Sequence, residues 1–82
     1  MDIQRLVKMA NDIGAFFESD PDKAQGARNV ANHLRRFWEP RMRREIFAYL
    51  DQSNGTGLKE LVLSALRNHR TEIDPTKYSP SS

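Results

Sequence analysis

The sequence contains no cysteine, and this absence excludes several classes of function. Without a thiol the chain can form no disulfide, carry out no thiol catalysis and supply no thiolate to a zinc or iron–sulfur site. A domain of ~70 to 80 residues has a marginal core unless a disulfide, a metal or a partner adds stability. An 82-residue chain without cysteine therefore depends on its packing or on a partner, and the absence is compatible with a reducing cytoplasm.

Long apolar runs are also missing. No stretch approaches the ~20 apolar residues that a membrane-spanning helix needs, and Met1 is followed directly by the charged Asp2. We therefore expect neither a membrane span nor a secretory signal, and we expect a cytoplasmic protein.

Residues that could carry out catalysis or bind a metal are few. His33 and His69 are the only histidines, and with no cysteine beside them they do not suggest a metal site. Asp20 and Asp22 lie at the start of a predicted helix, where carboxylates interact favourably with the helix dipole, so they do not indicate a catalytic pair. The segment NGTG lacks the length and the lysine of a phosphate-binding loop. We expect no catalytic residue, metal site or cofactor site, and so no enzyme activity in this chain alone.

Apolar residues recur at three- and four-residue spacing in four stretches, which predicts four amphipathic helices. We expect these helices at Asp2 to Glu18, about Pro21 to Trp38, about Pro40 to Leu50 and about Leu58 to His69. Pro21 and Pro40 each fit the first turn of a helix, where the missing N–H costs no hydrogen bond. The segment DQSNGTG has the composition of a turn. The fold class is therefore all-α, a small bundle of about four short helices.

The chain ends in TEIDPTKYSPSS, which contains two prolines, three serines and little to bury. This composition predicts a mobile C-terminal tail. The domain organisation expected from the sequence is a helical domain over residues 1–70 and a disordered tail over residues 71–82.

Several details of the helices follow from their sequences. Asp2 and Asp20 are the expected N-caps of the first two helices. The second helix has an alanine-rich face, which we expect to approach the Phe16–Phe17 end of the first helix closely. Its apolar stripe includes two large residues, Phe37 and Trp38. In the third helix the expected inward residues are Met42, Ile46, Tyr49 and Leu50.

The segment NHLRRFWEPRMRRE concentrates arginine around aromatic residues. Overall net charge is only +2, but residues 28–44 hold a single acid, Glu39, against six arginines: Arg28, Arg35, Arg36, Arg41, Arg43 and Arg44. A planar guanidinium binds carboxylates through paired hydrogen bonds and stacks on aromatic rings. Such a cluster suggests a binding surface.

Three interpretations of this cluster are open. Tryptophan and arginine are frequent energetic anchors of protein interfaces, which favours a protein-binding module. A small helical nucleic-acid-binding protein that uses the Arg28 to Arg44 basic region is the alternative, although the low net charge and an acidic first helix argue against it. In the third interpretation Trp38 only fills the corner between the second and third helices and the arginines are solvated.

Three segments together resemble a known family. RLVKMANDIGAFF, VANHLRRFWEPRMRREI and GLKELVLSAL are similar to the small delta subunit of cytoplasmic NAD-dependent, molybdenum-containing formate dehydrogenases, and the resemblance covers about residues 3 to 67. Its most specific part is the string H-x-x-x-F-W-x-P-R-M, formed here by His33, Phe37, Trp38, Pro40, Arg41 and Met42. The family usually has aspartate before this proline, whereas Glu39, a poorer N-cap, stands here.

The resemblance implies a non-catalytic accessory subunit that supports the assembly or stability of a larger enzyme through protein contacts. Molybdopterin, iron–sulfur clusters, FMN and NAD are then expected in the partner subunits, and contact is expected with the large molybdenum subunit. Either a permanent subunit or an assembly factor fits, and the isolated chain could form a homodimer. We expect Arg36, Arg41 and Arg43 to meet carboxylates, some of them internal. The expected contact motif comprises His33, Arg36, Phe37, Trp38, Pro40, Arg41, Met42 and Arg43.

Overall fold

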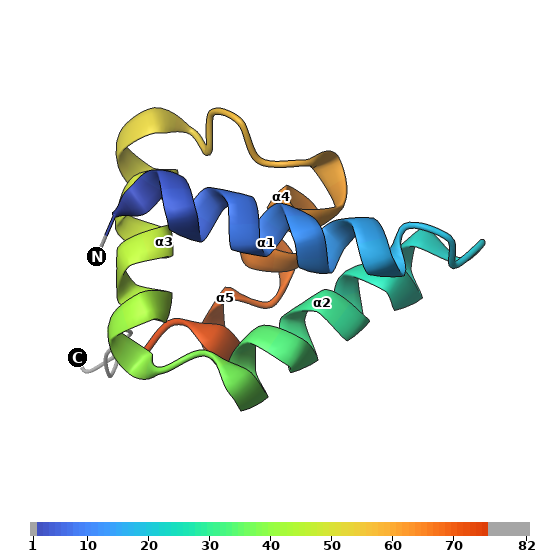
Figure 1. Ribbon diagram of the computed structural model, residues 1–82. Helices are drawn as coiled ribbons and strands as arrows, with labels where there is room; N and C mark the ends of the chain where they lie inside the picture. Colours follow the sequence, from blue (N-terminus) through green and yellow to red (C-terminus); the bar gives the residue numbers. More distant parts are fainter. Residues whose placement is uncertain (1, 76–82) are drawn as a thin grey trace.

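The computed structural model describes residues 2–75, and these residues fold into five helices without a β-strand (Figure 1). The all-α class predicted from the spacing of apolar residues is confirmed. The helices are α1 (Ile3–Phe17), α2 (Lys23–Phe37), α3 (Pro40–Ser53), α4 (Glu60–Asn68) and α5 (Arg70–Ile73).

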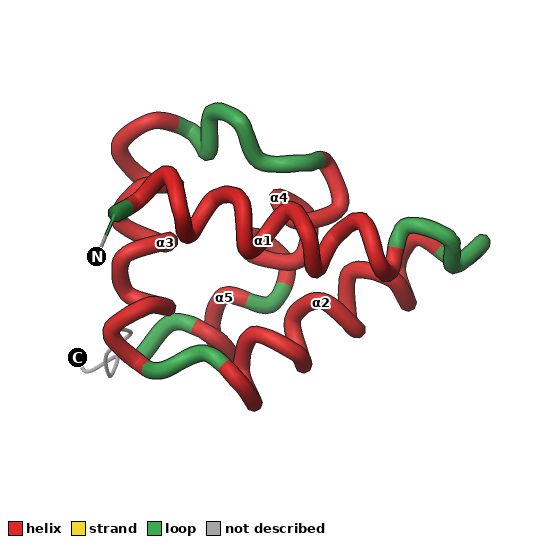
Figure 2. Tube along the Cα trace, viewed as in Figure 1, coloured by secondary structure: helices red, strands yellow, loops and turns green. Residues whose placement is uncertain are grey.

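The helices pack around α2. This helix contacts α1, α4 and α5, and α1 also contacts α3 and α4. In Figure 1, α1 and α2 run in opposite directions from a short connecting loop, and α3 stands across their far ends. The longer α3–α4 loop passes beside α1 (Figure 2). The part of the molecule where α1 and α2 come together therefore lies near the short loop and away from α3.

Local chemistry determines where the first two helices begin. Asp2 caps α1 as predicted, accepting a hydrogen bond of 3.0 Å from the Gln4 amide. The predicted cap of the second helix is wrong by two residues, because Asp22 accepts from the amides of Ala24 and Gln25 at 3.0 and 3.2 Å. Asp20 instead accepts from the Asp22 amide at 2.9 Å and closes the turn before the helix.

The third helix begins at Pro40 as predicted and continues to Ser53, about a turn beyond the predicted end. Glu39 occupies the N-cap position and its side chain makes no capping hydrogen bond, as expected for a poor cap. The helix ends where Asn54 and Gly55 adopt the left-handed conformation, with φ of 59° and 75°. α4 correspondingly starts later than predicted, at Glu60.

The core is formed by aliphatic residues of all five helices together with Phe47 and Trp38. Phe47 is almost completely buried but was not among the inward residues predicted for the third helix. α1 and α4 approach closely at Gly14, where an added Cβ would lie 2.7 Å from Cγ2 of Val62. Close packing of this kind is what a chain without disulfides requires.

The predicted boundary between domain and tail does not match the structure. Residues 71–73 belong to α5, and the side chain of Ile73 is 0% exposed. Asp74 is buried as well. The helical domain therefore extends beyond residue 70, and the rest of the predicted tail, residues 76–82, lies outside the described residues.

Candidate protein-binding surface

The arginine and aromatic motif divides into an inner and an outer part. Trp38 is only 5% exposed and its backbone N–H donates to the Leu34 carbonyl at 3.0 Å, so it fills the corner between α2 and α3 as one interpretation predicted. Met42 packs against the core. Arg43 is half-buried, and its Nη1 donates to the Ile73 carbonyl at 3.0 Å. These three side chains hold the scaffold together.

The outer part contains His33, Arg36, Phe37, Pro40 and Arg41, and only His33 among them is half-buried. Phe37, which the sequence places on the apolar stripe of the second helix, is 67% exposed. The buried face of α2 is completed by smaller residues and Leu34, and Phe37 lies at its edge in the last turn, where none of the helices within residues 2–75 covers it.

Phe16 is the other large apolar side chain that the core does not cover, with 75% exposure. The adjacent phenylalanines are a partial signal in the sequence, because two neighbouring rings at the end of a helix cannot both lie on one narrow apolar stripe. Phe17 takes the inner place and packs against the core, which leaves Phe16 outside.

Four rings join these exposed side chains into one surface, which we call the aromatic strip: Phe16, Phe17, His33 and Phe37. The ring centroids of Phe16 and Phe17 are 4.9 Å apart, with nearly perpendicular planes. His33 links the two helices, at 6.4 Å from Phe17 and 4.8 Å from Phe37. The strip therefore runs continuously from the end of α1 to the end of α2.

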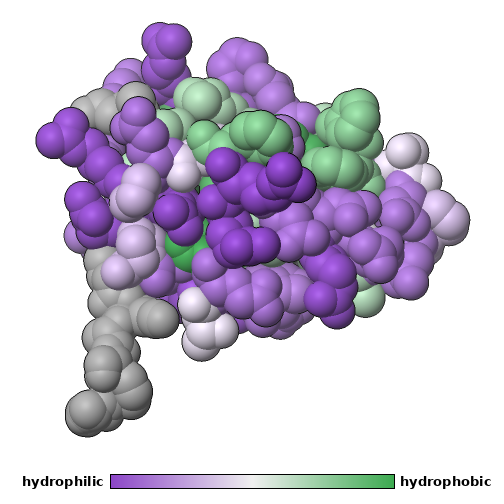
Figure 3. Space-filling view, turned by 90° about the horizontal axis from the view of Figure 1, so that it is seen from below, coloured by the Kyte–Doolittle hydropathy of each residue, from purple (hydrophilic) through white to green (hydrophobic). Residues whose placement is uncertain are grey.

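A hollow of about 310 Å³ lies beside the aromatic strip, lined by Ile13, Phe16, Phe17, His33 and Asp12. The lining is mainly apolar. In Figure 3 hydrophobic surface gathers along one edge of the molecule and is bordered by strongly hydrophilic surface. A hollow with exposed rings on its margin is suited to receiving apolar side chains of a partner.

Most arginines of the cluster face solvent. Arg36 lies over the Phe37 ring, with its guanidinium carbon 5.7 Å from the ring centroid. Arg28, Arg35, Arg41 and Arg44 are exposed. Within residues 2–75 none of the cluster arginines forms an ion pair. Two acidic side chains pair with lysines instead: Asp12 with Lys8 at 3.3 Å and Glu18 with Lys59 at 3.4 Å.

Comparison with known proteins identifies the family. A family model described as "NADH-dependant formate dehydrogenase delta subunit FdsD" matches residues 5–66, more than half of the chain. The chain belongs to this family. The resemblance inferred from the sequence is thus confirmed, and the matched region includes the aromatic strip and the Trp38 corner. No curated protein and no solved structure matches the chain.

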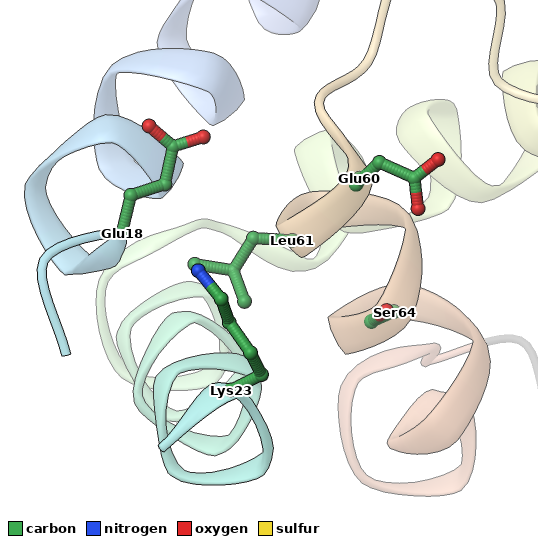
Figure 4. A pocket seen from close by; sticks show the side chains of 5 residues that line it. All are labelled: Glu18, Lys23, Glu60, Leu61 and Ser64. Carbon is green, nitrogen blue, oxygen red and sulfur yellow. The ribbon is translucent and has the colours of Figure 1, made fainter. Parts of the chain in front are cut away.

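The delta-subunit chain also has a more polar hollow of about 520 Å³, lined by Glu18, Lys23, Glu60, Leu61 and Ser64. It lies where the end of α1, the start of α2 and α4 meet (Figure 4). The carboxyl groups of Glu18 and Glu60 lie on opposite sides of this hollow and do not converge on a common point. The arrangement offers no carboxylate pair for acid–base chemistry.

The described part of this delta-subunit chain has neither a clustered set of metal ligands nor a membrane-spanning helix. No group of three or more histidine, cysteine, aspartate or glutamate residues is placed to hold a metal ion among residues 2–75. No helix in the same range is long and apolar enough to cross a membrane. The aromatic strip with its neighbouring arginines is therefore the surface feature that most clearly suggests a function.

Proposed function

We propose that this chain is a non-catalytic accessory subunit of an NAD-dependent molybdenum formate dehydrogenase, and that it supports assembly or stability of the complex through protein contacts. The observation that carries the proposal is the exposure of Phe16 and Phe37 in a member of the delta-subunit family, with Arg36 over the Phe37 ring and in no ion pair within residues 2–75. Such large aromatic side chains gain most free energy when a partner surface removes them from water.

The partners follow from the family. The molybdopterin, iron–sulfur clusters, FMN and NAD would be held by the catalytic and electron-transfer subunits, and the large molybdenum subunit is the proposed contact. This chain has no cysteine with which to ligate a cluster. Binding to the folded partner would stabilise both proteins by mass action, which is the physical basis of an accessory role.

The proposal can be tested in cells that produce the other formate dehydrogenase subunits with and without this chain. We expect the tagged chain to retain the molybdenum-bearing subunit, and we expect its omission to lower the yield of assembled complex and of NAD-dependent formate oxidation. Equal yield, cofactor content and activity without the chain would contradict the proposal. Recovery in stoichiometric amounts from mature enzyme indicates a permanent subunit, whereas recovery from immature complexes only indicates an assembly factor.

The exposure of five cluster arginines favours the nucleic-acid alternative. They are Arg28, Arg35, Arg36, Arg41 and Arg44. Neutralisation of several phosphates would give binding to duplex DNA that falls steeply with salt. We expect no such retention at physiological salt, because the net charge is only +2. Tight, steeply salt-dependent retention of a DNA duplex by the purified chain would favour this alternative over the subunit role.

A further inference from the structure

The aromatic strip has the geometry of a seat for one additional helix. Its rings come from two neighbouring helices, α1 and α2, and the hollow between them is lined by Ile13, Phe16, Phe17 and His33. A third helix packs well over the groove between two helices, because its side-chain ridge fits that groove. Helix-in-groove recognition is a common way of binding an amphipathic segment.

The charges beside the aromatic strip indicate which kind of segment fits. Asp12 lines the hollow, and Lys8 pairs with its carboxylate. Arg36 lies at the Phe37 end of the strip and has no ion pair within the described range of the chain. The charge without a partner at this surface is therefore positive.

Arg36 is also prepared for a specific contact. A guanidinium that lies over an aromatic ring can still donate hydrogen bonds from its edge, and two of its N–H groups match the two oxygens of a carboxylate. The Phe37 ring reduces the freedom that Arg36 loses when it binds. An acidic residue on the incoming segment would complete this pair beside the apolar contact.

We propose that the aromatic strip receives one amphipathic helix of a partner subunit, with apolar residues placed on Phe16 and Phe37 and a carboxylate paired with Arg36. The inference rests on the proposed function and refines it, since it places the docking surface on α1 and α2. Trp38, Met42 and Arg43, which the sequence grouped with the contact motif, belong to the scaffold instead.

A cross-linking experiment on the assembled complex identifies the occupant. A photo-reactive phenylalanine analogue is placed at position 16 or 37, where it keeps an aromatic ring, and at exposed Arg67 of α4 as a control. We expect positions 16 and 37 to cross-link to the same segment of a partner subunit. Mass spectrometry should identify this segment, and its sequence should have apolar residues at helical spacing together with acidic residues. Position 67 should not reach that segment.

Charge reversal tests the ion pair. Arg36→Glu and Arg67→Glu make the same change in net charge on exposed positions, but only Arg36 lies at the strip. We expect R36E to weaken binding of the chain to the complex by about tenfold or more, and R67E to leave it unchanged. Changing the acidic residue of the cross-linked segment to lysine should restore binding to R36E.

Circular dichroism checks that each variant folds. Phe37→Ala should keep the wild-type melting curve, because Phe37 is exposed and contributes little to the core. Cross-links from positions 16 and 37 to a second copy of this chain, equal binding of R36E and R67E, or no cross-link to any partner would each overturn the inference. The proposed function stands in these cases if wild-type chain is still retained by the enzyme, and it fails together with the inference if wild type is not retained.

Discussion

Arg70 donates two parallel hydrogen bonds to Asp51, from Nη1 to Oδ1 at 2.7 Å and from Nη2 to Oδ2 at 2.8 Å. Its Nε also donates to Asp74 at 3.0 Å, and its guanidinium carbon lies 4.8 Å from the centroid of the Phe47 ring. One side chain thus fastens α5 to α3 and to the core. The hydrogen bonds and charge of Arg70 hold the pKa of Asp51 below its ordinary value of 3.8.

Asp51→Asn should therefore destabilise the domain in a pH-dependent way. A carboxylate whose pKa is lowered by folding contributes stability above its unfolded pKa of 3.8, and the contribution is lost as the pH falls through the lower pKa of the folded state. We expect the urea midpoint of D51N to lie below that of wild type at about pH 7, and the two midpoints to converge in acid below both pKa values.

The control for this prediction is the same change in an Arg70→Gln background. Without the guanidinium, Asp51→Asn should have a much smaller effect, because the two residues act as a pair. A D51N effect of equal size with and without Arg70, or a gap that widens in acid, would contradict this account of the pair.

Ile73 tests whether α5 belongs to the domain. Its side chain is fully buried, so Ile73→Ala should lower the free energy of unfolding by about 2 to 4 kcal/mol. Thr71→Ala, at an exposed position of the same helix, should change it by less than about 0.5 kcal/mol. Equal unfolding free energies for the two variants in urea titrations would show that α5 does not pack on the core in solution.

The difference between α5 and the other helices explains which parts of the fold could be predicted from the sequence. The long amphipathic helices, the Asp2 cap and the start of α3 at Pro40 follow from local chemistry, and so does Trp38 at the corner. α5 is a single turn with one buried residue, Ile73, so it has no apolar period to recognise. Its position depends on Arg43 of α3, which donates to the Ile73 carbonyl, and on Arg70 of α5 itself, which pairs with Asp51 of α3.

The aromatic strip was harder to predict for a different reason. Phe37 lies at the edge of the apolar stripe of α2, one helical turn from buried Leu34, and periodicity does not say which edge of a stripe a neighbouring helix will cover. The packing of α1, α4 and α5 against α2 decides this. The division of the motif string into inner and outer residues therefore required the tertiary structure.

Arg41 and Arg43 provide a matched pair for separating these parts. Arg43 donates to the carbonyl of Ile73, whereas Arg41 is exposed and has no ion pair in the described region. We expect Arg43→Ala to cost about 1 to 2 kcal/mol of unfolding free energy, because a charged donor to a backbone acceptor is lost. Arg41→Ala should cost less than about 0.5 kcal/mol. Thermal and urea unfolding of both variants would decide, and equal losses would contradict the assignment of Arg43 to the scaffold.

Asn11 connects α1 to the α3–α4 loop. Its Nδ2 donates to the Gly57 carbonyl and its Oδ1 accepts from the Lys59 amide, both at 2.9 Å. Asn11→Ala removes both hydrogen bonds, and we expect it to cost about 1 to 2 kcal/mol of unfolding free energy and to speed hydrogen exchange at the Lys59 amide.

Asn11→Asp separates the two hydrogen bonds. The carboxylate can still accept from the Lys59 amide, but it cannot donate to Gly57 and places an oxygen against the Gly57 carbonyl oxygen. The domain should therefore be destabilised, while the Lys59 amide stays more protected from hydrogen exchange than in N11A. Asn32→Asp and Asn32→Ala make the same changes at an exposed position of α2 and should be nearly neutral. If the Asn11 and Asn32 variants unfold at the same urea concentration, the loop is not held by this amide, and α4 must be positioned by its apolar contacts with α1 and α2 alone.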